Sequence, residues 1–233
     1  MKQVTIIGLG LIGASLGLAL KKLKNPPRVI GYDIQYDAAI RANKIKAVDK
    51  IERYLPDAVA DSNLVIVATP VGVVSKVFES IASSLPDGCI VSDTGSTKRE
   101  ILRLAEEILP KSVGFVGGHP MTGKLTGGVA EPDALLFKNA VYCLVPSVNA
   151  PPDDVDTLAR LVQQIGAHPY FTDPSEHDGL VAGISHLPYI LAVAITGALA
   201  AQPGWREMSN LAAGGYDIAT KLAGHDPRMY ADI

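Results

Sequence analysis

The sequence predicts a doubly wound α/β fold followed by an all-helical C-terminal domain. Short, continuously apolar runs alternate with segments of helical length through the first 172 residues, and the remainder has helical character with breaks near Gly204 and Gly214. Continuous apolar runs are typical of parallel strands that helices cover on both faces. We therefore expect a dinucleotide-binding sheet domain over residues 1–172 and a helical domain over residues 173–233.

The elements are expected in a regular order along the chain. Six apolar runs predict strands at residues 3–8, 28–33, 63–69, 88–94, 113–118 and 140–146. Helical length and spacing predict helices at residues 11–24, 71–85, 97–109 and 155–165, before a last strand in HPYFT at 168–172. The later apolar run 187–201 is shorter than the ~20 residues that a bilayer crossing needs, so we expect a buried helix there.

Composition and charge exclude several classes of function. The chain has 21 basic and 24 acidic side chains, and no segment gathers the basic ones, so neither nucleic acid nor a membrane is an expected partner. Cys89 and Cys143 are too few for a disulfide framework or a zinc site, and no metal is expected. The apolar N-terminus lacks the cleavage site of a signal peptide. We expect a cytoplasmic protein.

Three glycines follow the first predicted strand and open the first predicted helix. Gly8, Gly10 and Gly13 have the G-x-G-x-x-G spacing. The first permits a tight turn, the second lets a pyrophosphate approach the backbone, and the third lets the helix pack closely on the strand. The helix start at Leu11 and Ile12 offers N–H groups to phosphates. This context predicts a dinucleotide site on a Rossmann-type sheet; a purely structural turn is the alternative.

Further cofactor contacts are expected where later strands end. Asp33 ends the second strand. A carboxylate there binds ribose hydroxyls and repels a 2′-phosphate, which favours NAD over NADP, unless Asp33 only caps the next helix. Thr69 and Pro70 end another strand and either touch the cofactor or only begin a helix. Asp93, at the next strand end, is also expected among the cofactor-binding residues.

A histidine, His119, lies at the end of a predicted strand in the glycine-rich stretch VGFVGGHPMTG. Ser96, in SDTGSTK after the preceding strand, falls on the same rim of the sheet. A nicotinamide dehydrogenase needs an acceptor for a hydroxyl proton, and imidazole suits that task. We therefore predict His119 and Ser96 as catalytic residues. The alternatives are a structural histidine, a Ser96 that only caps a helix, and Lys98 as a solvated charge of the first helical turn.

Six stretches together carry a more specific pattern. They are IGLGLIG, SDTGSTK, GGHPM, LF followed by a strand that ends in Pro146, ISHLP, and GGYDIATKLAGHDPRMYADI. In this order, over essentially the whole chain, they resemble the prephenate and arogenate dehydrogenase family of tyrosine biosynthesis. The resemblance implies an NAD-dependent oxidative decarboxylation to 4-hydroxyphenylpyruvate or tyrosine. Hydride leaves the ring carbon that bears the 4-hydroxyl, and loss of the ring carboxylate as CO2 makes the product aromatic.

The resemblance also assigns roles to single residues. His119 would polarise the 4-hydroxyl, Ser96 would help to hold it, and His186 in SHLP would face the cleft from the helical domain. Lys221 stands where the family commonly has an arginine for the side-chain carboxylate; lysine keeps the charge but loses the bidentate fork, and a solvated lysine is the alternative. Tyr189 replaces the second histidine of many prephenate-preferring members, so the choice between prephenate and arogenate stays open.

The assembly and two other functions complete these expectations. The resemblance implies a homodimer through the helical domain, with the run 187–201 as its surface, although the core of a monomer would explain that run nearly as well. Family members usually continue beyond the equivalent of Ile233, so a missing C-terminal portion is one expectation.

Lys124 is either a second positive charge for the substrate or a surface residue. A β-hydroxyacid dehydrogenase that uses Lys221, and an NAD-binding regulatory protein without catalysis, remain alternatives.

Overall fold

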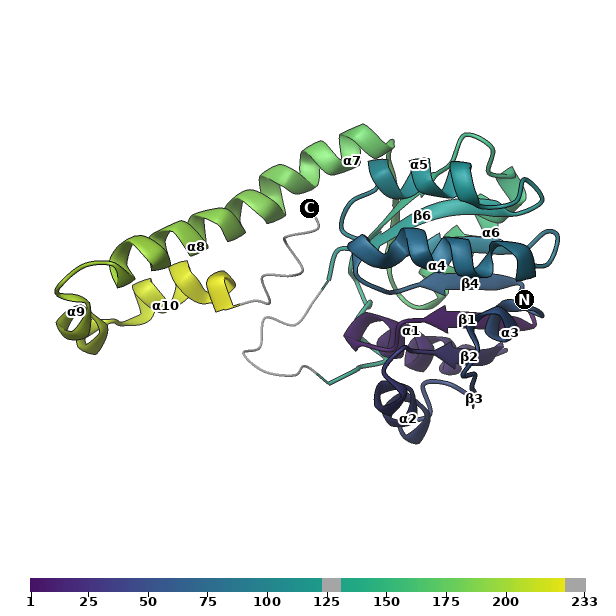
Figure 1. The fold of residues 1–233 in the computed structure, drawn as a ribbon, viewed down its shortest axis with the longest axis horizontal. Helices are drawn as coiled ribbons and strands as arrows, with labels where there is room; N and C mark the ends of the chain where they lie inside the picture. Colours follow the sequence, from purple (N-terminus) through teal and green to yellow (C-terminus); the bar gives the residue numbers. More distant parts are fainter. Residues whose placement is uncertain (123–130, 225–233) are drawn as a thin grey trace.

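The computed structural model describes residues 1–122 and 131–224 and has a sheet domain from which a long helical arm extends (Figure 1). The sheet has eight strands in the order β3-β2-β1-β4-β5-β6-β7-β8. The strands are β1 Gln3–Ile7, β2 Arg28–Tyr32, β3 Lys50–Ile51, β4 Leu64–Val67, β5 Ile90–Asp93, β6 Gly114–Pro120, β7 Val141–Pro146 and β8 His168–Phe171. The chain leaves β1 first toward β2 and later toward β4, so the predicted doubly wound fold class is confirmed.

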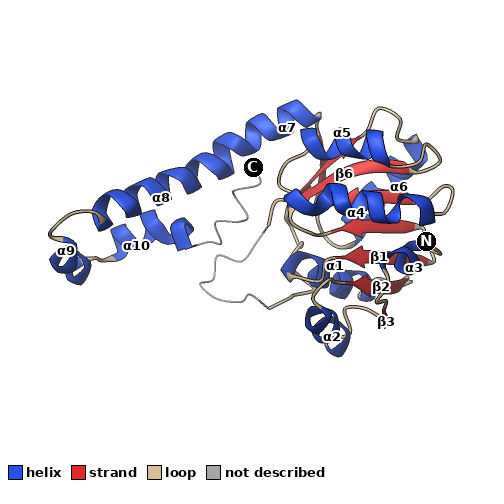
Figure 2. Cartoon of the chain, viewed as in Figure 1, coloured by secondary structure: helices blue, strands red, loops and turns tan. Residues whose placement is uncertain are grey.

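Helices cover both faces of the sheet (Figure 2). They are α1 Leu11–Lys21, α2 Tyr36–Lys44, α3 Leu55–Val59, α4 Val74–Ile81, α5 Arg99–Ile108 and α6 Pro152–Gln164. Successive strand residues point to opposite faces, so Ile6 packs in a cluster with α1 and α6, whereas Ile7 packs in a second cluster with α4 and α5. The continuous apolar runs therefore reflect burial on both faces, as expected for such a sheet.

The last two strands of the sheet, β7 and β8, run against the expected direction. All strand pairs are parallel except β6 with β7, which are antiparallel, with Pro120 opposite Tyr142. An apolar run reports burial on two faces but carries no information about strand direction. The described part of the connection between β6 and β7 holds turns and no helix, so the chain returns from the edge of the sheet where β6 ended. The two-residue strand β3 was not predicted because it is too short to form a run.

The helical arm begins with one long, continuous helix. It consists of α7 Pro174–Val181, a π-helical turn Ala182–His186 and α8 Leu187–Ala200. Two shorter helices, α9 Trp205–Leu211 and α10 Gly214–Thr220, follow, and α10 folds back against α8 (Figure 1). A last 3-10 turn, Lys221–Gly224, also contacts α8.

The expectation of a buried helix at 187–201 is wrong for the single chain. In α8 only Ala192 is buried, and Leu187 and Ile190 are 51% and 59% exposed. Of the described elements that follow α8, α10 and the last 3-10 turn contact it and leave most of its apolar side chains exposed. The continuous helix has 27 residues, and its most apolar 18-residue window has a mean hydropathy of 1.7, so by length and composition alone it could cross a membrane. Its exposed apolar face needs a partner, which is considered below.

Candidate active site

The glycine loop between β1 and α1 is shaped by close backbone contacts. Gly8 has φ +92°, and a Cβ there would lie 2.5 Å from the carbonyl oxygen of Ala68. A Cβ on Gly13 would lie 1.9 Å from the carbonyl oxygen of Gly8. Neither site admits a side chain. At Gly10 a Cβ would meet nothing within 4 Å, and α1 begins there without a capping side chain. Open space before uncapped N–H groups fits a bound pyrophosphate.

This contrast yields a prediction for Gly10→Ala. The added methyl group contacts no protein atom, so the unfolding free energy should change little, whereas it would occupy the space in front of the N–H groups of α1. We expect about a tenfold weaker affinity for NAD, equivalent to about 1.4 kcal/mol. Isothermal titration calorimetry with NAD measures the change. Gly204→Ala, also in open space but outside the loop, is the matched control. Equal affinities of the two variants would contradict a phosphate position at Gly10.

Asp33 lies directly after β2 and is tied to the glycine loop. One of its carboxylate oxygens, Oδ2, accepts a hydrogen bond from the backbone N–H of Leu9 at 2.7 Å, and Oδ1 accepts one from Gln35 at 2.8 Å. Helix α2 begins with Gln35 as its N-cap, so Asp33 is not the cap residue of that helix. Each oxygen can accept a further hydrogen bond, which suits ribose hydroxyls beside the loop.

Thr69 and Pro70 lie where β4 ends, next to the glycine loop. The Thr69 Cγ2 atom would be 3.1 Å from a Cβ on Gly8. Three buried side-chain polar atoms of the described residues have no hydrogen-bond partner, namely Thr69 Oγ1, Ser92 Oγ and His186 Nε2. A buried hydroxyl without a partner is costly, so the position of Thr69 Oγ1 fits a group bound at this rim. Pro70 precedes the 3-10 turn Val71–Val73 that leads into α4.

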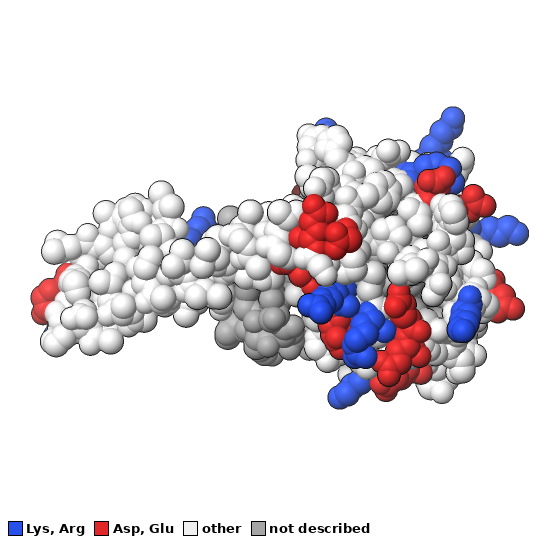
Figure 3. Space-filling model, turned by 90° about the horizontal axis from the view of Figure 1, so that it is seen from above, with Lys and Arg blue, Asp and Glu red and all other residues white. Residues whose placement is uncertain are grey.

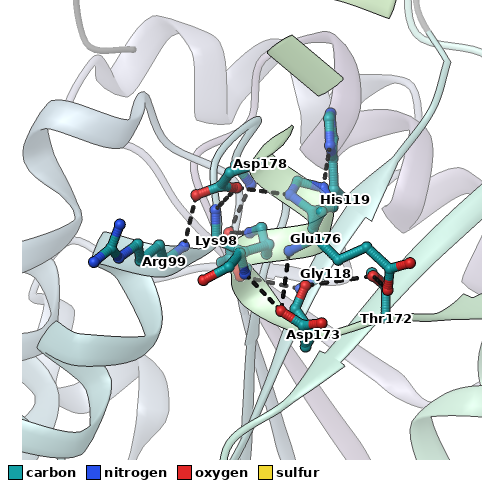
Figure 4. Close-up of polar contacts among 12 residues, drawn as sticks. Lys98, Arg99, Gly118, His119, Thr172, Asp173, Glu176 and Asp178 are labelled. Carbon is teal, nitrogen blue, oxygen red and sulfur yellow. Dashed lines mark hydrogen bonds and ion pairs between the residues drawn. The ribbon is translucent and has the colours of Figure 1, made fainter. Parts of the chain in front are cut away.

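His119 lies near the end of β6 and takes part in a chain of hydrogen bonds (Figure 4). Its Nδ1 lies 3.0 Å from Nε2 of His177, and Nδ1 of His177 lies 2.8 Å from Oδ1 of Asp178. The Asp178 carboxylate also accepts hydrogen bonds from the backbone N–H groups of Lys98 and Arg99, at 2.7 and 3.0 Å. Helix α7 is thereby fixed to the start of α5, and the end of β6 is connected to both.

The electrostatic setting keeps His119 neutral. Burial, and next the positive charge of Lys98, lower the pKa of His119 from 6.5 to about 3. Burial alone would raise the pKa of Asp178, but the hydrogen bonds from His177 and from the backbone of Arg99 and Lys98 outweigh it and lower the pKa. At physiological pH the imidazole of His119 is therefore neutral and the carboxylate of Asp178 is charged, with the ring of His177 between them.

Lys98 is fully buried, so its interpretation as a solvated charge is wrong. It forms an ion pair with Asp93, whose side chain is also inaccessible. The oxygen of Asp93 that faces Lys98, Oδ2, also accepts a hydrogen bond from the backbone N–H of Gly95 at 2.7 Å. The other oxygen, Oδ1, accepts one from the backbone N–H of Gly118 at 3.1 Å. This pair therefore ties the end of β5 to the end of β6, beside His119. The contact of Asp93 with a cofactor stays a prediction, because these hydrogen bonds come from the protein.

The other predicted site residues lie in different parts of the molecule. Ser96 is half-buried in the loop between β5 and α5, on the same edge of the sheet as His119. His186 is half-buried in the π-helical turn, and burial lowers its pKa. Tyr189 is half-buried in α8, whereas Lys221 is exposed and takes no part in the hydrogen bonds around His119. Lys124 lies outside the described residues.

Sequence reasoning missed His177 and Asp178. Both are part of PSEHDGL, at the start of the first helix after the last strand. The adjacent imidazole and carboxylate were the available indication, but a sequence does not show that His177 lies against His119. In residues 1–122 and 131–224, no cluster of His, Cys, Asp and Glu could hold a metal ion.

Two family models match consecutive parts of the chain. The model "Prephenate dehydrogenase, nucleotide-binding domain" matches residues 16–171, and "Prephenate dehydrogenase, dimerization domain" matches residues 173–233. A prephenate dehydrogenase of Bacillus subtilis is 35% identical over 232 residues, which are 99% of this chain and 62% of the relative. The chain thus spans less than two thirds of the length of that relative.

Two solved structures share the arrangement of both parts. The structure of prephenate dehydrogenase from A. aeolicus, in complex with hydroxyphenyl propionate and NAD+, has a TM-score of 0.91 and 26% identity, and the match covers all of this chain and 81% of that one. The structure of Synechocystis arogenate dehydrogenase has a TM-score of 0.80 and 28% identity, and the match covers 98% of this chain and 81% of that one.

Proposed function

The chain belongs to the prephenate dehydrogenase family, and from that premise we propose that it catalyses the NAD-dependent oxidative decarboxylation of prephenate or arogenate. The products are 4-hydroxyphenylpyruvate and tyrosine, respectively. One observation supports this most directly. A half-buried histidine, held neutral and hydrogen-bonded through Nδ1, lies at the edge of the sheet where the strands next to the glycine loop end.

The cofactor proposal rests on the residues around the glycine loop. Gly10 leaves space for a pyrophosphate, Asp33 is held beside the loop for ribose hydroxyls, and Thr69 has a buried hydroxyl without a partner. The A. aeolicus relative was solved with NAD+, which supports NAD as the nucleotide. Bound NAD supplies a hydride acceptor.

His119 suits a reaction that needs a hydrogen-bond acceptor more than a strong base. With a pKa lowered to about 3, the imidazole is neutral, and its Nε2 can accept a hydrogen bond from the 4-hydroxyl of the substrate. Loss of CO2 makes the ring aromatic and supplies the driving force, so polarisation of the hydroxyl is sufficient. Ser96 would orient the same hydroxyl, and the buried Nε2 of His186 is available to a bound polar group.

The side chain of the substrate is expected to contact two residues of the arm and one lysine that follows β6 in the sequence. Prephenate carries a keto acid side chain and arogenate an amino acid side chain, and both end in a carboxylate. Lys221 and Lys124 are the candidate cations for it, with Tyr189 as the candidate neighbour of the keto or amino group. Since a lysine holds a carboxylate through a point charge, we expect weaker selection of its orientation than with an arginine.

The test is formation of NADH by the wild-type protein with prephenate and, separately, arogenate, each with NAD and with NADP. We expect turnover with NAD and at least one substrate, and much weaker use of NADP because Asp33 repels the 2′-phosphate. Binding of NAD without reduction by either substrate would contradict the proposal and would favour a regulatory role.

We also propose that the arm forms a homodimer. The model that matches residues 173–233 is described as a dimerization domain. Only 17% of the most apolar window of the long helix is buried in the single chain, and Figure 3 shows few charged side chains on the visible face of the arm. An exposed apolar face of this size is typical of a subunit interface. A dimer would cover it without a membrane.

Ile190→Glu is expected to shift the dimer toward monomer. Ile190 is 59% exposed on α8, and a buried carboxylate without a partner is strongly unfavourable in an interface. Sedimentation velocity at several protein concentrations measures the change. Gln202→Glu, which adds the same charge at an exposed position just beyond α8, is the control and should remain dimeric. A monomeric wild type that co-sediments with lipid vesicles would instead support a membrane helix.

A further inference from the structure

We propose that His177 is a positioning residue, which accepts a hydrogen bond from Nδ1–H of His119 and so leaves Nε2 of His119 as the acceptor for the substrate hydroxyl. The inference rests on the proposed function, in which His119 accepts that hydrogen bond. It concerns a residue of the arm rather than of the sheet domain, since His177 is part of α7.

When the rings of His119 and His177 are both neutral, the chain of hydrogen bonds has one consistent direction, which begins at Asp178. An ionised carboxylate can only accept, and Asp178 already accepts from the backbone N–H groups of Lys98 and Arg99. At 2.8 Å from Asp178 Oδ1, Nδ1 of His177 must therefore carry a proton. Nε2 of a neutral His177 then has a lone pair.

The same reasoning continues to the candidate catalytic ring. Nδ1 of His119 lies 3.0 Å from Nε2 of His177, so it must donate, because two lone pairs cannot face each other at that distance. A neutral imidazole with a proton on Nδ1 has its lone pair on Nε2. Without His177, nothing in this chain of contacts would favour that tautomer over the opposite one.

His177 is held firmly enough to serve this purpose. The residue is 1% exposed. Asp173 caps α7 by accepting hydrogen bonds from the backbone N–H groups of Ser175 and Glu176, at 2.9 and 3.0 Å, and its carbonyl accepts one from the backbone of His177 (Figure 4). On the other side, Asp178 is fixed by the start of α5. The ring of His177 thus has a single orientation toward His119.

Two variants separate positioning from simple packing. In His177→Gln, the carboxamide oxygen can accept from Nδ1–H of His119 while the NH2 group donates to Asp178; in His177→Leu, neither bond can form. We expect the leucine variant to lose about 10²-fold in kcat with little change in KM, a loss of the size found for side chains that orient metal-bound histidines. The glutamine variant should recover most of this loss. Equal losses in both variants, or full activity of the leucine variant, would overturn the proposal.

A measurement without turnover tests the tautomer itself. The chain has five histidines, so their side-chain 15N signals can be assigned by single replacements. We expect His119 of the wild type and of His177→Gln to carry its proton on Nδ1, and a shift toward the Nε2–H form in His177→Leu. A proton on Nε2 in the wild type would overturn the inference even if the enzyme is active. If neither substrate is turned over, the proposed function fails, and the tautomer still decides about His177.

Discussion

Replacement of His119 by alanine is expected to lower kcat by about 10²- to 10⁴-fold, the range observed when a general acid–base group is removed. The loss follows because His119, near the end of β6, is the proposed acceptor for the 4-hydroxyl, and the variant removes its neutral imidazole. Stopped-flow measurement of NADH formation at saturating substrate gives the change in kcat.

The matched control for this variant is His168→Ala. His168 is exposed on β8, the outermost strand of the sheet, and takes no part in the hydrogen bonds around His119. It should retain wild-type kcat, and both variants should bind NAD with unchanged affinity. A His119→Ala variant with more than about a tenth of wild-type kcat would contradict a catalytic role and leave a structural histidine.

Lys98→Met is expected to lower the free energy of unfolding by about 3–5 kcal/mol. The side chains of Lys98 and Asp93 are both inaccessible, so the variant would leave a buried carboxylate without its cation. The cost of such an uncompensated charge exceeds what the apolar methionine gains by packing in the same space. Urea unfolding, followed by circular dichroism, measures the difference.

Two comparison variants test the physical cause. In the double variant Lys98→Met with Asp93→Asn, the charge is absent, so most of the lost stability should return. Lys21→Met removes the cation of an ion pair with Asp49 that is partly exposed, and it should cost less than about 1 kcal/mol. If Lys98→Met and Lys21→Met have the same free energy of unfolding, a buried Asp93 carboxylate without its cation is not the cause of instability.

Features with a local cause could be predicted from the sequence. The glycine loop was found because Gly8 and Gly13 are required by backbone contacts at fixed spacing after a strand. The doubly wound sheet was found because burial on both faces gives continuous apolar runs. The position of His119 followed from the same reasoning, since the ends of neighbouring parallel strands meet at one edge.

Features that depend on a distant partner could not be predicted. Lys98 follows a strand in a polar stretch, and nothing local distinguishes a buried lysine paired with Asp93 from a solvated one. His177 acquires its role only because α7 packs against α5 and the end of β6. The direction of β7 depends on where the chain returns after β6, and the exposure of α8 depends on how much of the arm covers it.

The π-helical turn in the arm sets the rotation, about the helix axis, of the Ile190 face relative to the ring of His177. His177 and Ile190 are part of one continuous helix, and the turn Ala182–His186 lies between them. Such a turn accommodates an additional residue without a break in the helix. Each residue turns an α-helix by about 100°, so deletion of one residue there would rotate the face of Ile190 by that angle relative to the ring of His177. The proposed subunit interface at Ile190 and the contact of His177 with His119 could then no longer form from the same helix.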